Sequence, residues 1–402
     1  MPRSARSAAT DVRRQTKADN IYAQEAAQTD RTHQSRSLRR PPTATHEPVR
    51  LRSPARTPPS KEEPMLGVSD DAYCSVAVGV PSPPRPAGSV RRTSTVDITV
   101  AAGPRPGLRL EGRGRDLRTA SGGAEVLDEA TLSAVVDTGS GTLTELTVSP
   151  ASWQEPLQAL VGRSARSGFR RALATVAPDL ATSGRLLALL LDDVPVCVLV
   201  SGNLRTRHPA AGPSAGGHPP AGVCAGWQPD GRLLTLAEES GGSPLVLGPP
   251  SSLLVDPGDP TGWHDLPELG AWSMRRARRL DLVPEPGGGV RLAAYMRDVR
   301  RLDDPAPRTV HEYSITGRID GTGTLRRIDA VPHVLPAPEC PQAAASAGRL
   351  HGRNVAELRE HVGREFVGVS TCTHLNDVLR AVGDARLLLD AVNRIQIRHG
   401  RR

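Results

Sequence analysis

One sequence unit occurs twice in this chain of 402 residues, and the duplication restricts the folds that the chain can adopt. Ser89-Val-Arg-Arg precedes Asp97 at the same distance at which Ser273-Met-Arg-Arg precedes Asp281. Further matches between the two halves are Arg115-Asp116 with Arg297-Asp298, Gly141-Thr-Leu with Gly323-Thr-Leu, and Leu160-Val-Gly-Arg with Leu350-His-Gly-Arg. Two matching units of this length predict two copies of one local fold.

The copies differ at positions where chemistry would need particular side chains. Asp128 of the first copy aligns with His311 of the second, and Ser183 aligns with Cys372. Cys340 falls in a loop that is shorter in the first copy. The second copy is therefore the candidate functional half.

The second copy has the sequence pattern of a meander followed by helices. Apolar and polar residues alternate over residues 290–297, and a second alternating run carries His311 on its apolar side. Asp320-Gly-Thr-Gly supplies a hairpin turn before a return strand over residues 325–331. An amphipathic helix follows Cys372. We expect the α+β class, with two tandem copies of an antiparallel meander followed by helices.

The positive charge lies mainly ahead of the first copy. Residues 1–64 carry 13 Lys and Arg against 7 Asp and Glu, whereas the whole chain has a net charge of +8. A basic segment rich in Pro, Ser and Thr buries too little apolar surface to fold, which predicts a disordered arm. Nucleic acid is an expected partner only non-specifically through this arm, because it lacks aromatic stacking residues. The expected organisation is an arm (1–88), the first copy (89–200), a connector with Cys-Ala-Gly-Trp (201–272), the second copy (273–390) and a basic tail (391–402).

Two features favour a cytoplasmic protein without a membrane segment. The most apolar stretch, residues 186–200, is interrupted by Asp192-Asp193, and no secretory signal precedes it. The five cysteines are scattered along the chain rather than arranged as a disulfide framework, which is typical of a reducing compartment.

Three side chains of the second copy stand at the ends of predicted elements, where they can meet above the sheet. His311 starts a strand, Cys340 precedes a helix, and Cys372 opens the last helix. A helix N-terminus favours a thiolate, the form that binds zinc or iron. His374 is a fourth candidate of lower rank, because two residues along a regular helix place it on the side away from Cys372. We expect these four residues to bind zinc, iron or an iron-sulfur cluster.

Other functions stay open at this point. The duplicated sheets are consistent with a metal-free module that binds an unknown protein partner. A thiol-dependent enzyme acting on a small acyl or carbonyl substrate would pair Cys372 or Cys340 with His311. Buried cysteines and a core histidine would also satisfy the pattern without any function. In the connector, Cys224 and His264 would cap a site on the second copy, or the neighbouring tryptophans would anchor the connector.

The second copy resembles an uncharacterised bacterial family, a domain of unknown function with a C-terminal Cys-Thr-His-Leu signature. The resemblance covers residues 273–383, and the residues that carry it are Arg275-Arg276, Arg297-Asp298, His311-Glu312, Cys340-Pro341 and Cys372-Thr-His-Leu. A more distant similarity is to the NifU/IscU-type iron-sulfur cluster scaffolds. It implies that His311 replaces the scaffold's Asp and that Cys340 and Cys372 match its middle and last Cys. Thr309 stands near the scaffold's first Cys, and Thr371 stands where a His often precedes the last Cys.

Overall fold

The computed structural model describes residues 79–101, 107–208, 219–240, 244–246, 248–303 and 306–399. Residues 1–78, most of the predicted arm, lie outside the described residues, as do residues 400–402 of the predicted tail. The last ten residues of the arm as expected from sequence, 79–88, are described. Residues 391–399, expected as a tail, belong to the final helix, α10.

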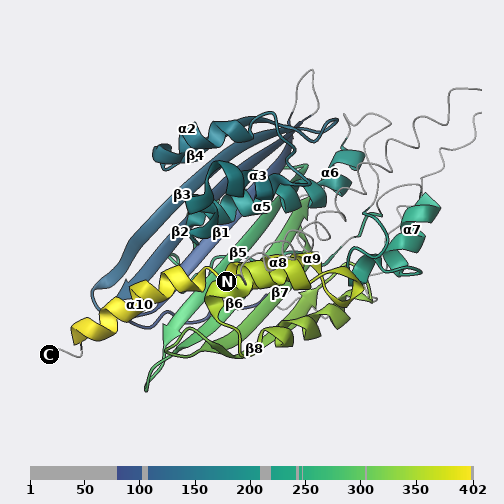
Figure 1. Cartoon of the computed structure of the whole chain (residues 1–402). Coiled ribbons are helices and arrows are strands. Elements are labelled where there is room, and N and C mark those ends of the chain that lie inside the picture. The colour runs from purple at the N-terminus through teal and green to yellow at the C-terminus, as the bar shows by residue number, and fades with distance from the viewer. Residues whose placement is uncertain are drawn as a thin grey trace, which may run out of the picture. The chain divides into compact units, whose positions relative to one another are not determined.

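The strands of both copies form one antiparallel sheet with the order β4-β3-β2-β1-β5-β6-β7-β8 (Figure 1). The first copy supplies four strands, which are β1 (Val90–Ala101), β2 (Gly107–Ala120), β3 (Gly123–Asp137) and β4 (Leu143–Ser149). The second copy supplies β5 (Ser273–Pro284), β6 (Val290–Arg301), β7 (Arg308–Ile319) and β8 (Leu325–Val334). The prediction of two meanders is confirmed, and their fusion into one sheet is a feature that was not predicted.

The two copies join through β1 and β5, which pair antiparallel from Val90 opposite Leu282 to Thr99 opposite Ser273. This register places Arg91 opposite Asp281 and, reciprocally, Arg275 opposite Asp97. Arg91 Nε lies 2.5 Å from Asp281 Oδ1, and Arg275 Nε lies 2.6 Å from Asp97 Oδ1. The repeated motif is therefore self-complementary, and the copies are related by a local two-fold axis.

The correspondence extends past the strands. In the first copy, Leu143 N donates to Arg163 O at 2.9 Å, and in the second copy Leu325 N donates to Arg353 O at 2.8 Å. The glycine before each arginine adopts a positive φ and donates back to the same leucine. This second contact confirms the alignment beyond the sheet.

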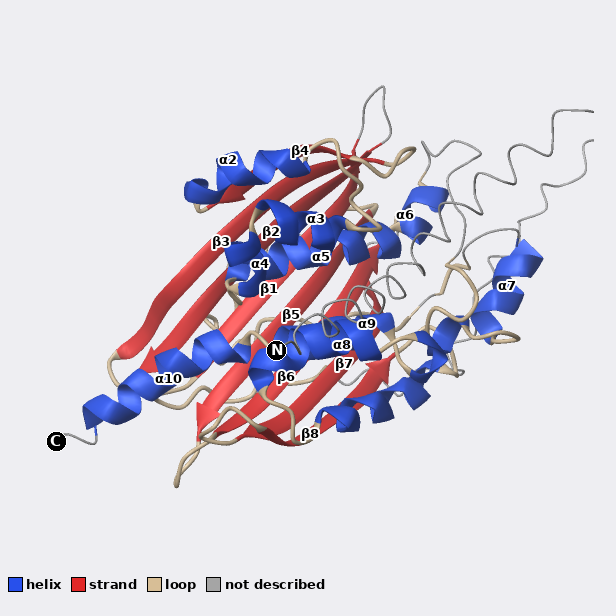
Figure 2. Ribbon diagram, viewed as in Figure 1, coloured by secondary structure: helices blue, strands red, loops and turns tan. Residues whose placement is uncertain are grey.

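Helices cover one face of the sheet, as Figure 2 shows. In the first copy and the connector they are η1 (Ala151–Trp153), α2 (Gln154–Leu157), η2 (Gln158–Leu160), α3 (Phe169–Val176), α4 (Pro178–Thr182), α5 (Leu186–Val200), α6 (Gly202–Arg207), η3 (Ala225–Trp227) and α7 (Arg232–Ser240). In the second copy they are η4 (Cys340–Leu350), η5 (Val355–Glu357), α8 (Leu358–Glu365), η6 (Gly368–Ser370), α9 (Thr373–Val382) and α10 (Ala385–His399). None of the described helices has both the length and the apolar character that crossing a bilayer requires.

Each copy has its own apolar core beneath its helices, and the copies exchange one core residue across the axis. Val90 of the first copy packs in the second core, and Met274, its aligned residue, packs in the first. Between the cores lies a largely buried network of charged side chains. Its arginines are Arg170, Arg276, Arg278, Arg359 and Arg380, and its aspartates are Asp192, Asp193, Asp377 and Asp384. Ion pairing offsets the free-energy cost of removing these charges from water.

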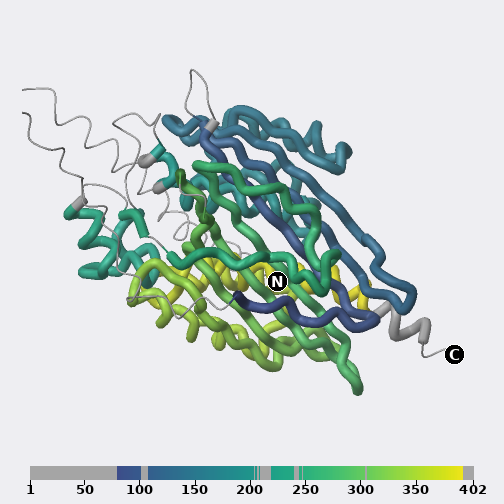
Figure 3. Tube along the Cα trace, turned by 180° about the vertical axis from the view of Figure 1, so that it is seen from behind, coloured from purple at the N-terminus to yellow at the C-terminus, as the bar shows by residue number. Residues whose placement is uncertain are grey.

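The opposite face of the sheet is covered by the segment before β1 and by the connector (Figure 3). Arg85 of the first segment donates to Asp259 of the connector at 2.8 Å, and Arg279 of β5 donates to Ser82 at 2.8 Å. Both faces of the central strands are therefore buried, which explains why the arginines of β1 and β5 are almost unexposed.

Candidate metal centre

Asp298 of β6 is the anchor of the candidate site, on the face that the helices cover. Its side chain is 1% exposed, and Arg276 of the neighbouring strand binds both oxygens, with Nε 2.9 Å from Oδ1 and Nη2 3.2 Å from Oδ2. Burial alone would raise the pKa of Asp298, but the charge of Arg276 and the two nearby imidazoles hold it below its ordinary value. The carboxylate is therefore ionised and fixed in orientation.

A β-bulge places His311 beside this carboxylate. Asp298 pairs with His311 while Val299 pairs with Thr309, so that Val310 is an extra residue in β7. Bulges of this kind redirect side chains next to functional sites. His311 Nδ1 lies 3.2 Å from Asp298 Oδ2.

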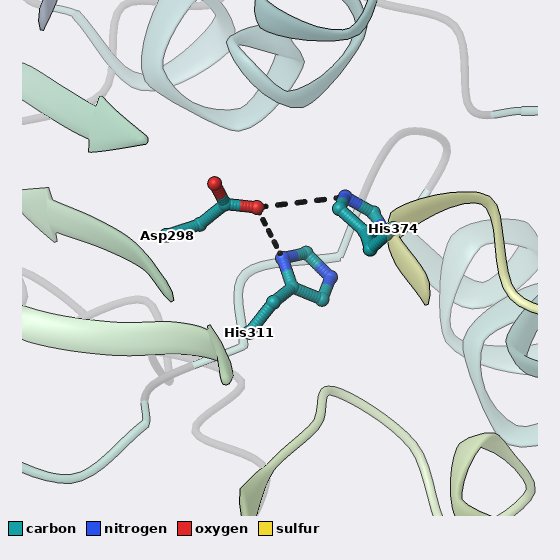
Figure 4. Close-up of side chains that lie close together, drawn as sticks. All are labelled: Asp298, His311 and His374. Carbon is teal, nitrogen blue, oxygen red and sulfur yellow. Dashed lines mark ion pairs between the residues drawn. The ribbon is translucent and has the colours of Figure 1, made fainter. Parts of the chain in front are cut away.

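His374 approaches the same oxygen from the first turn of α9, with Nε2 3.7 Å from Asp298 Oδ2. The His311 and His374 rings are stacked with centroids 3.6 Å apart and planes inclined by 19° (Figure 4). Asn376 fixes the start of the helix, because its side-chain amide donates to Phe366 O at 2.9 Å. The helix thus carries His374 to a defined position above the sheet.

Two nitrogen atoms in this group lack hydrogen-bond partners. Among the described residues, neither His311 Nδ1 nor His374 Nε2 has one, although both atoms are buried. Burial, and then the neighbouring His311, lower the pKa of His374 well below its ordinary value, so its ring is neutral. The nitrogens and one oxygen of Asp298 all lie within 4.8 Å of one another. Leaving buried nitrogens unpaired costs free energy, so the arrangement suits a group that binds them.

The second nitrogen of His374 faces a different set of partners. Its Nδ1 lies 3.4 Å from Thr373 Oγ1 and 4.0 Å from Cys372 Sγ. A proton on Nδ1 can be donated to either atom, which leaves the lone pair of Nε2 on the side of Asp298. Cys372 caps α9 in an extended conformation outside the helix. The sequence argument separated Cys372 from His374 for a regular first turn, and the extended cap at Cys372 is the irregularity that brings the two side chains close.

The predicted thiols lie on the far side of His374. Cys340 and Cys372 are each 4% exposed and belong to the apolar core of the second copy. Burial raises the pKa of Cys372 to about 11, and that of Cys340 rises well above its ordinary value for the same reason. The expectation that the start of α9 favours a Cys372 thiolate is wrong, since the loss of water outweighs the backbone N–H groups.

The four residues predicted from sequence thus fall into two groups, which are linked by the Cys372-Thr-His turn. His311 and His374 meet at Asp298, whereas Cys340 and Cys372 lie together behind His374. Sequence reasoning missed Asp298 as a ligand candidate. A signal for it was present, because Arg297-Asp298 repeats Arg115-Asp116 of the first copy.

The connector histidine has a structural role on the other face of the sheet. His264 Nδ1 and Nε2 lie 2.9 Å from the hydroxyls of Thr93 and Thr95, respectively. Burial, with a smaller effect of Arg115, lowers its pKa to about 3. Glu312 also faces this side and accepts a hydrogen bond from the Tyr295 hydroxyl, so it does not turn toward His311.

Comparison with known proteins finds a family match within the second copy. Residues 274–387 match the family described as Protein of unknown function (DUF2889), which spans Asp298, His311, Cys340 and the Cys372-Thr-His turn. No curated protein and no solved structure matches the chain, and similarity to the NifU/IscU-type scaffolds is not supported. The match therefore covers the second copy, from β5 to the start of α10, and not the rest of the chain.

Proposed function

We propose that the second copy binds one divalent metal ion, zinc or iron(II), through Asp298, His311 and His374. The observation that carries this proposal is the pair of buried, unpartnered imidazole nitrogens facing one ionised carboxylate. Two ligands bound at about 2.0–2.2 Å from an ion stand roughly 3.0–3.6 Å apart. The spacings of 3.2 and 3.7 Å from Asp298 Oδ2 are close to this range.

The groups around the ligands also suit a metal ion. Arg276 orients Asp298, and Thr373 with Cys372 can hold the proton of His374 on Nδ1. Outer partners of this kind fix the tautomer and the ring orientation of metal-binding histidines. Two imidazoles and one carboxylate are ligands that zinc and iron(II) both accept.

The donor set favours a single ion over an iron-sulfur cluster, because the irons of such clusters are held mainly by thiolates. Three protein ligands leave positions on the ion for water or a substrate, so the site is open to Lewis-acid or redox chemistry. The thiol-enzyme alternative has less support, since Cys340 and Cys372 are buried and their pKa values are raised.

Metal analysis tests the proposal directly. Protein purified without oxygen and without chelators should contain zinc or iron, and the Asp/His site should account for one equivalent of the metal that the metal-free protein takes up in a calorimetric titration. The double substitution His311→Ala with His374→Ala should remove this one equivalent. Replacing the exposed His351 with Ala is the matched control and should leave it unchanged. A metal stoichiometry that the double substitution leaves unchanged would disprove the assignment.

A further inference from the structure

A third thiol joins the two cysteines of the second copy. Of the cysteines described, Cys197 lies in the core of the first copy, whereas Cys224, Cys340 and Cys372 are all buried at the second. These three come from segments far apart in the sequence, the connector, the start of η4 and the cap of α9. Such convergence is notable in a chain with five cysteines.

Close backbone contacts bring the connector to this place. Ala225 N donates to Thr371 O at 2.9 Å, which joins the residue after Cys224 to the residue before Cys372. On the other side, a Cβ built on Gly226 would lie 2.6 Å from Cys340 Sγ. The connector main chain therefore lies against the Cys340 thiol and beside the residue before Cys372, and Gly226 is the residue that permits the approach to Cys340.

Polar groups point into the thiol group. Backbone N–H groups of Gly226, Trp227 and Thr373 face the Cys224 sulfur. The Tyr313 hydroxyl, on a side chain with no exposed surface, faces Cys372 and has no other hydrogen-bond partner among the described residues. Cysteines that serve only as small apolar residues do not require N–H donors around sulfur, whereas bound thiolates accept such bonds.

We infer that Cys224, Cys340 and Cys372 form a second metal site, which takes a zinc-type divalent ion. Three thiolates match the preference of zinc for sulfur, at Zn–S distances of about 2.3 Å, and leave a fourth position for another ligand. The three sulfur atoms are not all within 4.8 Å of one another, so metal binding requires these side chains to move closer together. This site is separate from Asp298 and shares with it only the Cys372-Thr-His turn.

Cobalt(II) is a suitable probe, because it replaces zinc and reports thiolate ligands by an intense near-ultraviolet charge-transfer absorption. Reduced, metal-free wild-type protein should bind two equivalents, of which one gives this absorption. Cys224→Ser should lose the absorption and keep the other equivalent. The His311→Ala and His374→Ala double variant should show the reverse. Cys197→Ser is the matched control, a buried thiol outside the group, and should behave as wild type.

A measurement on the wild type alone guards against variants that fail to fold. The X-ray absorption fine structure of zinc-loaded protein should show sulfur neighbours at about 2.3 Å. Absence of both sulfur neighbours and the cobalt charge-transfer band in fully reduced wild-type protein would overturn the inference. So would a band of unchanged intensity in a folded Cys224→Ser protein. Neither result would affect the Asp298 site, which contains no sulfur ligand.

Discussion

The two copies hold the same charged pair on equivalent strands but surround it differently. In the first copy, Arg92 binds Asp116 with Nε–Oδ1 and Nη2–Oδ2 distances of 2.7 Å, as Arg276 binds Asp298 in the second. The bulge also recurs, because Leu127 is an extra residue just before Asp128. The scaffold of the site is therefore common to both halves.

The difference lies in the charges that face the two equivalent aspartates, Asp116 and Asp298. Asp128 and Arg185 of the first copy align with His311 and His374 of the second. Burial and the charge of Asp116 raise the pKa of Asp128, while Arg92 and Arg185 oppose this shift. The first copy thus supplies positive charge from its own arginines. The second copy places imidazole nitrogen atoms at these positions instead, and the proposed metal ion would supply the positive charge there.

The largest effect on metal binding is expected from a substitution of Asp298. Asp298→Asn removes the only charged ligand and should weaken binding at the Asp/His site by more than about 100-fold, since each ligand contributes several kcal/mol. Asp116→Asn is the equivalent change in the first copy and should leave metal affinity unchanged. Calorimetric titration measures both, with thermal unfolding as a check of the fold. Equal losses of metal affinity in Asp298→Asn and Asp116→Asn would refute the proposal that only the second copy binds the ion.

The comparison can be tested in the opposite direction by giving the first copy the histidines of the second. The double substitution Asp128→His with Arg185→His should create a new site and raise the zinc stoichiometry by one equivalent. We expect an affinity about 10–100-fold below that of the native site, because the outer partners are not matched. Asp128→His alone serves as the control and should add no equivalent. An unchanged stoichiometry in a folded double variant would show that the scaffolds are not equivalent.

Much of the fold could be predicted, because period-two alternation and the matched residues locate the strands of the second copy and, through the alignment, those of the first. The joining of β1 to β5 could not be predicted from either copy alone. It depends on residues about 190 positions apart, such as Arg91 and Asp281. The repeated Arg and Asp do indicate this pairing when the two copies are taken together. An Arg and an Asp at the same spacing in both copies pair reciprocally in an antiparallel register.

The candidate site was only partly accessible to sequence reasoning for a related reason. Comparing the copies draws attention to residues that differ, such as His311, and away from a ligand that both copies retain, such as Asp298. An ideal helix would place His374 on the side away from Cys372, whereas the extended cap at Cys372 changes that geometry. The approach of Cys224 depends on tertiary contacts, which local sequence patterns do not encode.

A smaller effect is expected from the arginine that orients Asp298. Arg276 also reaches Asp377 Oδ2 at 3.2 Å, one turn of α9 beyond His374, so it ties the ligand-bearing helix to the ligand-bearing strand. Arg276→Lys keeps the charge but loses the two-point contact, and zinc affinity should fall by about 10-fold. Arg92→Lys in the first copy should not change affinity. A zinc titration of both folded variants separates the two explanations. Both substitutions remove a buried two-point contact and lower stability, but only Arg276→Lys should lower zinc affinity.

The smallest predicted effect concerns a contact that only the first copy has. His264 binds Thr93 and Thr95 of β1, whose aligned residues in β5 are Ala277 and Arg279 and offer no hydroxyl. The pKa of His264 is lowered to about 3 in the folded protein, whereas an unfolded histidine titrates near 6.5. The unfolded chain therefore takes up a proton first as the pH falls, and stability decreases below about pH 6.5.

Between pH 7.5 and pH 6 this linkage should lower the free energy of unfolding by about 0.8 kcal/mol. His264→Gln should be less stable at pH 7.5, because at least one hydroxyl contact is lost, and should lack this part of the pH dependence. The exposed His351→Gln variant provides the comparison and should retain it. Denaturant unfolding at the two pH values measures the difference. If both variants lose stability equally on acidification, His264 is not the group that makes the face of the first copy sensitive to acid.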